Sequence, residues 1–236
     1  MASGFRRKYR KRFRRSRSST ANLRALSSLV SRLKYFDSSP NQSGSPLSLT
    51  YANSLQISST WNAADTKFYC VNTPVNGTGV NNRISTQILV KSIHFRCHLM
   101  GNTSGNPACV RFMILVDSRP VSTVNMTDIL QGFPGTTTNA VTPMAFNKLE
   151  QIDRFRTLCD KRVCLPNVMQ NVASFRMVDI NLKCNVLTQF GGTGTGTYGS
   201  VSDIYGNGIY LLIFSDQSLN APTLAEAVCR IRYIDN

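Results

Sequence analysis

The chain has 236 residues, of which 42% are apolar, so it is long enough to bury a substantial core. It carries 27 Lys and Arg against 12 Asp and Glu, a formal net charge of +15. No stretch approaches the roughly 20 apolar residues of a membrane span, and no apolar run follows the charged start as in a signal peptide. These features favour a soluble protein made in a reducing compartment, with a polyanion as its partner.

Most of the excess charge lies in an arm at the start of the chain. Residues 1–36 contain 12 Lys or Arg and no acidic residue, whereas residues 37–236 contain 15 basic and 12 acidic residues. In "RRKYRKRFRRSR" (6–17), nine of the twelve positions are basic. Charge this dense cannot be buried, so we expect the arm to be disordered when free and to draw its counter-ions from a partner.

The composition of the arm favours nucleic acid as that partner. Arginine pairs with phosphate through its planar fork, and aromatic side chains stack on unpaired bases. An anionic membrane surface is the alternative partner. The nine basic residues of the arm also match a nuclear localisation signal. The predicted nucleic-acid-binding residues are Arg6, Arg7, Lys8, Tyr9, Arg10, Lys11, Arg12, Phe13, Arg14, Arg15 and Arg17.

The end of the arm has the pattern of a short helix. In "ANLRALSSLVSRLKYF" (21–36), leucine and valine recur at helical spacing, which predicts a short amphipathic helix. Three further cations here are second-tier candidates for binding phosphate: Arg24, Arg32 and Lys34. The next segment, residues 37–46, is rich in serine and contains two prolines, which predicts a linker. A folded domain is therefore expected over residues 47–236.

Strand patterns dominate this domain. The stretches "SIHFRCHL" (92–99), "VDINLKCNV" (178–186) and "CRIRY" (229–233) alternate apolar and polar residues, as antiparallel strands with one wet face do. Two continuous apolar runs, "CVRFMILV" (109–116) and "IYLLIF" (209–214), predict strands that are buried on both faces.

The remainder of the domain consists mainly of long Gly-, Asn- and Thr-rich connections. One helix is predicted over "MAFNKLEQI" (144–152), with Thr142 as its cap and Pro143 in its first turn. The fold class expected is all-β: a single jelly-roll β-sandwich of about eight antiparallel strands in two sheets, with the basic arm attached.

No catalytic or metal site is expected, and no cofactor. The seven cysteines are scattered without a CxxC pair, which favours reduced, buried thiols; a disulfide between Cys159 and Cys164 is left open. His94 and His98 lie about 13 Å apart along a strand, too far to share a metal ion. "GTGTYG" (194–199) matches a dinucleotide-binding pattern, but no helix follows it. An enzyme on this scaffold would need clustered acids or histidines.

Several stretches occur in an order that is known from viral coat proteins. A strand ending in Asp-x-Arg-Pro precedes an Arg-Phe-centred strand, and the last strand ends in aromatic-x-Asp. With the Arg-rich arm and Ser/Pro linker, the chain resembles the coat proteins of small circular single-stranded DNA viruses, the geminivirus and circovirus relatives. It lacks the Cys/His cluster of plant geminivirus coats. The stretches are "RISTQILVKSIHFRCHL" (83–99), "VRFMILVDSRP" (110–120), "DRFRTLCDKRV" (153–163) and "NGIYLLIFSDQSLNAP" running on to "CRIRYID" (207–235).

The resemblance implies a jelly-roll capsid subunit that assembles into an icosahedral shell of about 60 copies or a multiple. It implies a single-stranded DNA genome, host nuclear import receptors and an unknown host-cell receptor as partners, with the protein located in the virion and the host nucleus. Two alternatives stay open. One is the capsid protein of a small single-stranded RNA or satellite virus, and the other is a cellular nucleic-acid-binding protein with a basic tail.

Deleting residues 1–36 tests whether the arm binds the nucleic acid and whether the domain folds without it. We expect the remaining chain to stay folded and to lose most of its affinity for single-stranded DNA. Nine arm cations engaged on a single strand predict a slope of log K against log salt near −6, at about −0.7 per contact. Fluorescence anisotropy over a salt series measures both quantities, and an unchanged affinity and slope in the truncated protein would contradict the assignment.

Overall fold

The computed structural model describes ten parts of the chain: residues 33–38, 55–56, 68–101, 107–121, 124, 126–132, 141–166, 174–191, 199–217 and 222–235. Within them the chain is nearly all β, and none of their helices is long and apolar enough to cross a membrane. The strands are β1 (Leu33–Ser38), β2 (Leu55–Gln56), β3 (Phe68–Cys70), β4 (Gln87–Met100), β5 (Ala108–Asp117), β6 (Phe155–Leu165), β7 (Phe175–Phe190), β8 (Ile204–Gly206), β9 (Gly208–Ser215) and β10 (Thr223–Asp235). The short helices are α2 (Met126–Ile129) and two 3-10 turns, η2 (Leu149–Gln151) and η3 (Val201–Asp203).

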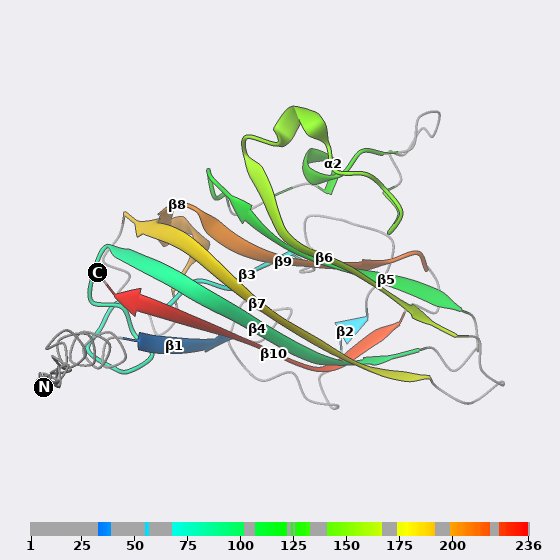
Figure 1. Ribbon diagram of the computed structural model, residues 1–236, viewed down its shortest axis with the longest axis horizontal. Helices are drawn as coiled ribbons and strands as arrows, with labels where there is room; N and C mark the ends of the chain where they lie inside the picture. The colour runs from blue at the N-terminus through cyan, green and yellow to red at the C-terminus, as the bar shows by residue number, and fades with distance from the viewer. Residues whose placement is uncertain are drawn as a thin grey trace, which may run out of the picture. The chain divides into compact units, whose positions relative to one another are not determined.

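The strands form two sheets that pack face to face (Figure 1). The larger sheet has the order β1-β10-β4-β7-β8, with β2 also paired to β10, and the smaller has the order β3-β9-β5-β6. Long antiparallel ladders join β4 to both β7 and β10. The main core lies between the sheets, where Phe95 of β4 contacts Phe112 of β5 at a ring-centroid distance of 6.0 Å. The alternating sequences 92–99, 178–186 and 229–233 are thereby confirmed as antiparallel strands with one buried face.

The smaller sheet is also covered on its other face. All ten residues of β5 and all eight of β9 are buried, which confirms that the two continuous apolar runs are strands buried on both faces. A second apolar cluster joins Met113 and Phe214 of this sheet to Met126 and Ile129 of α2. In Figure 1, α2 lies over the smaller sheet, on the side away from the larger one. The connection between β5 and β6 thus supplies a third layer.

Buried charges fix this connection to the sheet. The guanidinium of Arg111 is almost wholly buried; it bonds both carboxylate oxygens of Asp160, at 2.8 and 2.7 Å, and donates to the carbonyls of Pro143 and Ala145. The buried carboxylate of Asp117 accepts two bonds from Arg154, each 3.0 Å long. Bidentate Arg–carboxylate pairs hold their partners in one geometry, so both ends of the covering segment are anchored.

Three predictions about local structure need correction. Residues 33–36, predicted as the end of a helix, and residues 37–38, predicted as linker, form strand β1, so the domain includes residues before 47. The compact unit begins at Lys34. The predicted helix over 144–152 is reduced to the three-residue turn η2, because the Arg111 bonds to carbonyls 143 and 145 hold that backbone outside a helical ladder.

The remaining parts of the predicted helix and linker, residues 21–32 and 39–46, lie outside the described residues. Strand β1 begins at Leu33, so a deletion of the arm that is meant to spare the domain must end at residue 32.

Strand β1 is fastened to the end of β10 by a charged clip. Lys34 Nζ donates to Asp235 Oδ2 at 2.8 Å, and the same carboxylate accepts from the backbone N–H groups of Ile84 and Ser85. Burial by itself raises the pKa of Asp235, but the bonds from Lys34 and the two amides outweigh it and lower the pKa below its ordinary value. The folded state therefore favours the ionised carboxylate.

Asp235→Asn should destabilise the domain by about 1–3 kcal/mol, because a charged acceptor of several hydrogen bonds is lost. Since the pKa is lowered by folding, the contribution of Asp235 is fully present above its unfolded pKa of about 4 and is lost as the pH falls through the folded value. Urea unfolding at pH 7 and at pH 3 measures this. Glu150→Gln, at an exposed carboxylate remote from the clip, is the control; an equal effect of Asp235→Asn at both pH values would contradict the clip.

Candidate nucleic-acid interface

The arm residues predicted to bind nucleic acid, Arg6 to Arg17, lie outside the described residues, as do Arg24 and Arg32. Of the second-tier candidates, only Lys34 is described. Its ammonium group bonds to Asp235 and to the carbonyl of Asn82, at 2.8 and 2.9 Å. Because these bonds hold Lys34 in the domain, we assign it a structural role instead of a phosphate-binding one.

The outer face of the larger sheet is a second surface of interest, and its central part is electrically neutralised. The carboxylate of Asp37 in β1 accepts two hydrogen bonds from the guanidinium of Arg230, at 2.6 and 2.7 Å. Asp179 of β7 bonds to Arg96 and His94 of β4, at 3.0 and 2.9 Å. These paired charges leave little net field in the middle of the sheet.

Hydrogen bonds in these pairs favour the charged forms of Asp179 and Arg230. Desolvation by itself raises the pKa of the Asp179 carboxyl. The hydrogen bonds and charges of His94 and Arg96 outweigh this effect, so the pKa lies below its ordinary value. The hydrogen bond to Asp37 raises the pKa of Arg230. The last histidine of this face, His98, lies 3.3 Å from Glu226. Each histidine thus has a carboxylate partner of its own, and the described residues hold no group of His, Cys, Asp and Glu that could bind a metal ion.

Cations without an acidic partner lie on the same face, in the half of the sheet that leads to Asp235. Arg232 of β10 and Lys183 of β7 are both exposed, and the strand register places both of them directly beside Ser92 of β4. Lys91 is next to Ser92 and donates to the amide oxygen of Asn185. Within the described part of the chain, no carboxylate pairs with these three cations. We call Lys91, Lys183 and Arg232 the basic row.

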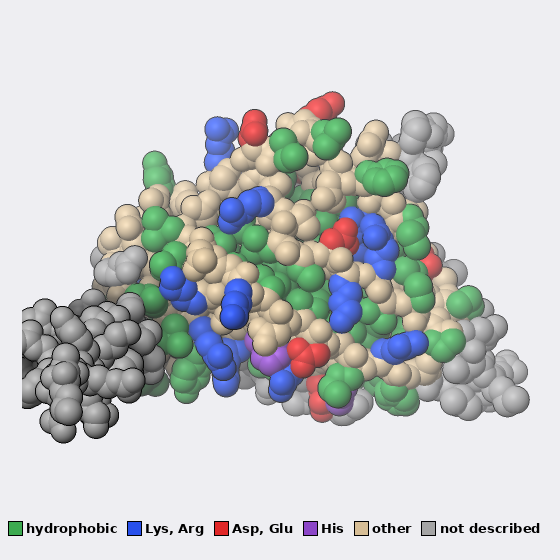
Figure 2. Space-filling view, in the orientation of Figure 1, with side chains coloured by type: hydrophobic (Ala, Val, Ile, Leu, Met, Phe, Trp, Pro, Cys, Tyr) green, Lys and Arg blue, Asp and Glu red, His purple; other side chains and the backbone are tan. Residues whose placement is uncertain are grey.

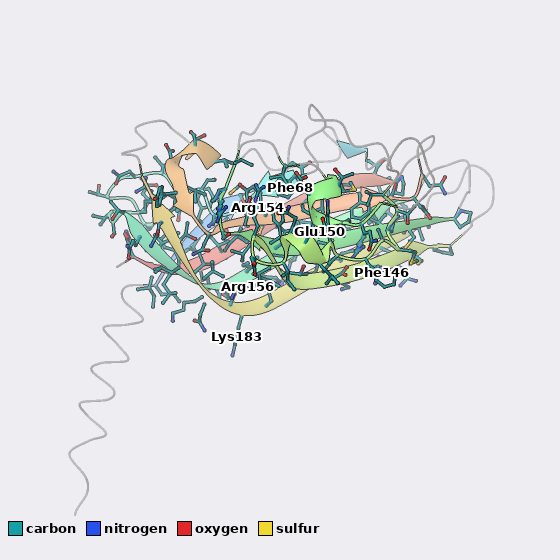
Figure 3. The ribbon with its side chains drawn as sticks, turned by 90° about the horizontal axis from the view of Figure 1, so that it is seen from above. Phe68, Phe146, Glu150, Arg154, Arg156 and Lys183 are labelled. Carbon is teal, nitrogen blue, oxygen red and sulfur yellow. The ribbon has the colours of Figure 1, made fainter. Side chains whose placement is uncertain are left out.

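The basic row is accessible to solvent. Figure 2 shows Lys and Arg side chains at the surface over much of the face in view, with Asp and Glu side chains at several places among them. Lys183 projects from β7 away from the body of the domain (Figure 3). At about 3.4 Å per residue, Arg232 lies about 10 Å along β10 from Asp235, which holds Lys34. The basic row therefore lies in the half of the sheet that contains the Lys34–Asp235 ion pair.

This geometry suits contacts with phosphate. Three flexible cations that lack carboxylate partners attract polyanions without regard to base sequence. The basic row was missed from the sequence because its members come from three strands far apart in the chain. The alternation did place Lys183 and Arg232 on wet faces, but only the register shows that they flank the same residue. Comparison of the chain with protein-family models and with curated proteins found no match.

We expect the basic row to carry the weak single-stranded DNA binding that remains after residues 1–32 are deleted. Three phosphate contacts predict a slope of log K against log salt near −2, at about −0.7 per contact. Replacing Lys91, Lys183 and Arg232 by Gln should flatten this slope toward zero without lowering the melting temperature, because none of the three forms part of the core.

The matched control is Lys148→Gln, which removes a cation that lies 3.7 Å from Glu150 in the other layer. Anisotropy titrations of the truncated protein at several salt concentrations measure the slopes. If Lys148→Gln changed the slope as much per charge removed as the triple variant, binding would be a property of net charge and not of the row.

Proposed function

We propose that this protein is the capsid subunit of a small single-stranded DNA virus, with a jelly-roll domain that forms the shell and an arm that holds the genome. The observation that carries the proposal is the strand order. Lettering β1, β3, β4, β5, β6, β7, β9 and β10 as B to I in chain order gives sheets B-I-D-G and C-H-E-F. A jelly roll pairs its strands in this order, and it is a frequent architecture of viral capsid domains. This lettering leaves out the short strands β2 and β8, which belong to the larger sheet.

The distribution of charge supports genome packaging. The arm concentrates nine cations in residues 6–17, and the domain adds the three cations of the basic row. Together they neutralise phosphate without reading sequence, which is what packaging an entire genome requires. The nine arm cations also serve as the nuclear localisation signal that host import receptors recognise. A single-stranded RNA genome would use the same contacts, so it remains the alternative that the packaged contents decide.

Exposed apolar side chains support self-association. The segment 144–152, which lies on the smaller sheet's side of the domain, exposes 80% of Phe146 and 77% of Leu149. Met144 and Ile152 of the same segment are 58% and 65% exposed. Figure 2 shows hydrophobic side chains at the surface at the top of the view, where Figure 1 places this layer. Clustered exposed apolar residues are typical of protein–protein contacts, and in a capsid the partner is another copy of the chain.

Electron microscopy of the full-length protein, combined with absorbance at 260 and 280 nm, tests the proposal. We expect uniform closed shells with a nucleic-acid-rich spectrum, and sequencing of the nuclease-protected contents should return single-stranded DNA. Protected RNA would favour the RNA-virus alternative. A small species that binds nucleic acid and never closes, over a sweep of salt and pH, would favour a cellular nucleic-acid-binding protein.

The double substitution of Phe146 and Leu149 by Ser should block assembly and leave the monomer folded, because both side chains are largely exposed. Light scattering and microscopy report assembly, and circular dichroism reports folding. Val80→Ser is the matched control, since Val80 is 71% exposed outside this segment. Normal shells from the double variant would exclude segment 144–152 from the subunit contacts.

A further inference from the structure

Two cysteines face each other across strands β5 and β6. Cys109 and Cys164 are direct partners in the antiparallel register, and their Sγ atoms lie 3.5 Å apart. Both are free thiols. The sequence left open a pairing of Cys164 with Cys159, but Cys159 is the partner of Ile114 in the same ladder. Cys159 packs against the main core between the sheets, whereas Cys164 is exposed, so the structure places Cys164 with Cys109 instead.

The backbone around Cys109 favours a cross-strand bond. Its N–H donates to Asp216 Oδ1 at 2.9 Å, and its carbonyl accepts from the Asp216 N–H at 3.2 Å. Both backbone groups of Cys109 thus point away from β6, which makes Cys109 and Cys164 a non-hydrogen-bonded pair. In such pairs the Cα atoms are about 4.5 Å apart, within the range of about 4.4–6.8 Å that a disulfide spans. Rotation of the two side chains can therefore bring the sulfurs to bonding distance without moving the strands.

The two thiols differ in access. Cys164 lies exposed on β6, the edge strand of the smaller sheet, whereas Cys109 is buried. Burial raises the pKa of the Cys109 thiol to about 11. The fully buried Cys229 has its pKa raised to about 12 by the same cause and lies in the other sheet. An oxidant in solution accordingly meets Cys164 first.

We propose that Cys109 and Cys164 form an oxidation-dependent disulfide that locks β6 to β5. With glutathione disulfide as the oxidant, the Cys164 thiolate attacks one of its sulfurs and releases one glutathione thiolate. The Cys109 thiolate then attacks Sγ of the mixed disulfide at Cys164 and releases the second glutathione. The two protein thiols lose two protons and two electrons, and one glutathione disulfide becomes two glutathione thiols.

The proposed disulfide would close a loop of the chain that contains the layer covering the smaller sheet. The two cysteines are 55 positions apart, and the chain between them contains α2 and segment 144–152. Closing a loop of this length restricts the unfolded chain and so stabilises the folded one. The pair stays reduced in a reducing compartment and closes in an oxidising one. This inference does not depend on the proposed capsid function, because it rests on the thiol geometry alone.

The test is to incubate the full-length protein in a series of glutathione disulfide to glutathione ratios, block free thiols with N-ethylmaleimide and map peptides by mass spectrometry without reduction. We expect one intramolecular disulfide, Cys109–Cys164, and a melting temperature several degrees above that of the reduced protein. The rate of closure should rise about tenfold per pH unit above neutrality, because the Cys109 thiolate is scarce below its raised pKa.

Cys159→Ser and Cys164→Ser are the matched variants, since both change one thiol of β6. The first should retain the disulfide and the melting shift, and the second should lose both. Three outcomes would overturn the proposal: a stable mixed disulfide at Cys164 that never closes, a bond between Cys164 residues of two chains, or a bond that uses Cys159. The mapping of the unmodified protein decides this even if a variant fails to fold.

Discussion

The strands β5 and β9 have apolar side chains on both faces, so both faces of the smaller sheet must be covered by other parts of the domain. The larger sheet covers one face through a core that includes Phe95 and Phe112. The described parts of the chain between β5 and β6 cover the other, and outside α2 and η2 they are irregular. In an irregular segment the backbone N–H and C=O groups have no partner strand to hydrogen-bond with, so side chains must supply hydrogen bonds to the buried ones. Arg111 supplies them by bonding two carbonyls of that layer and the carboxylate of Asp160.

This arrangement leaves the two outer surfaces of the domain with different chemistry. The covering layer exposes apolar side chains at Phe146 and Leu149, which suit contacts with other proteins. The outer face of the larger sheet has neutralised ion pairs and, beside them, the basic row. The basic row therefore distinguishes the larger sheet's outer face, while both surfaces expose apolar side chains, among them Phe175 and Met177 of β7.

Basic residues are used differently in the arm and in the domain. Charge as dense as that of residues 6–17 could not be accommodated within a folded core, since each buried cation would need an acidic partner. In the domain, two arginines form ion pairs that join neighbouring segments: Arg154 is bonded to Asp117, and Arg230 to Asp37. Elsewhere among the described residues of the domain, the register leaves Arg232 and Lys183 without carboxylate partners.

Local patterns in the sequence were enough to predict the all-β class, the long alternating strands and the double burial of two apolar runs, because side-chain alternation is a local property of a strand. They also located the basic arm, since charge density needs no fold to be recognised. They were wrong for residues 33–36, predicted as helix, and for residues 37–38, predicted as linker. Pairing with β10 and the Lys34–Asp235 ion pair hold both stretches in strand β1. Strand order, the basic row and the Cys109–Cys164 pair depend on the tertiary structure. Each joins residues from distant parts of the chain, and it is the register between strands, absent from any local pattern, that brings them together.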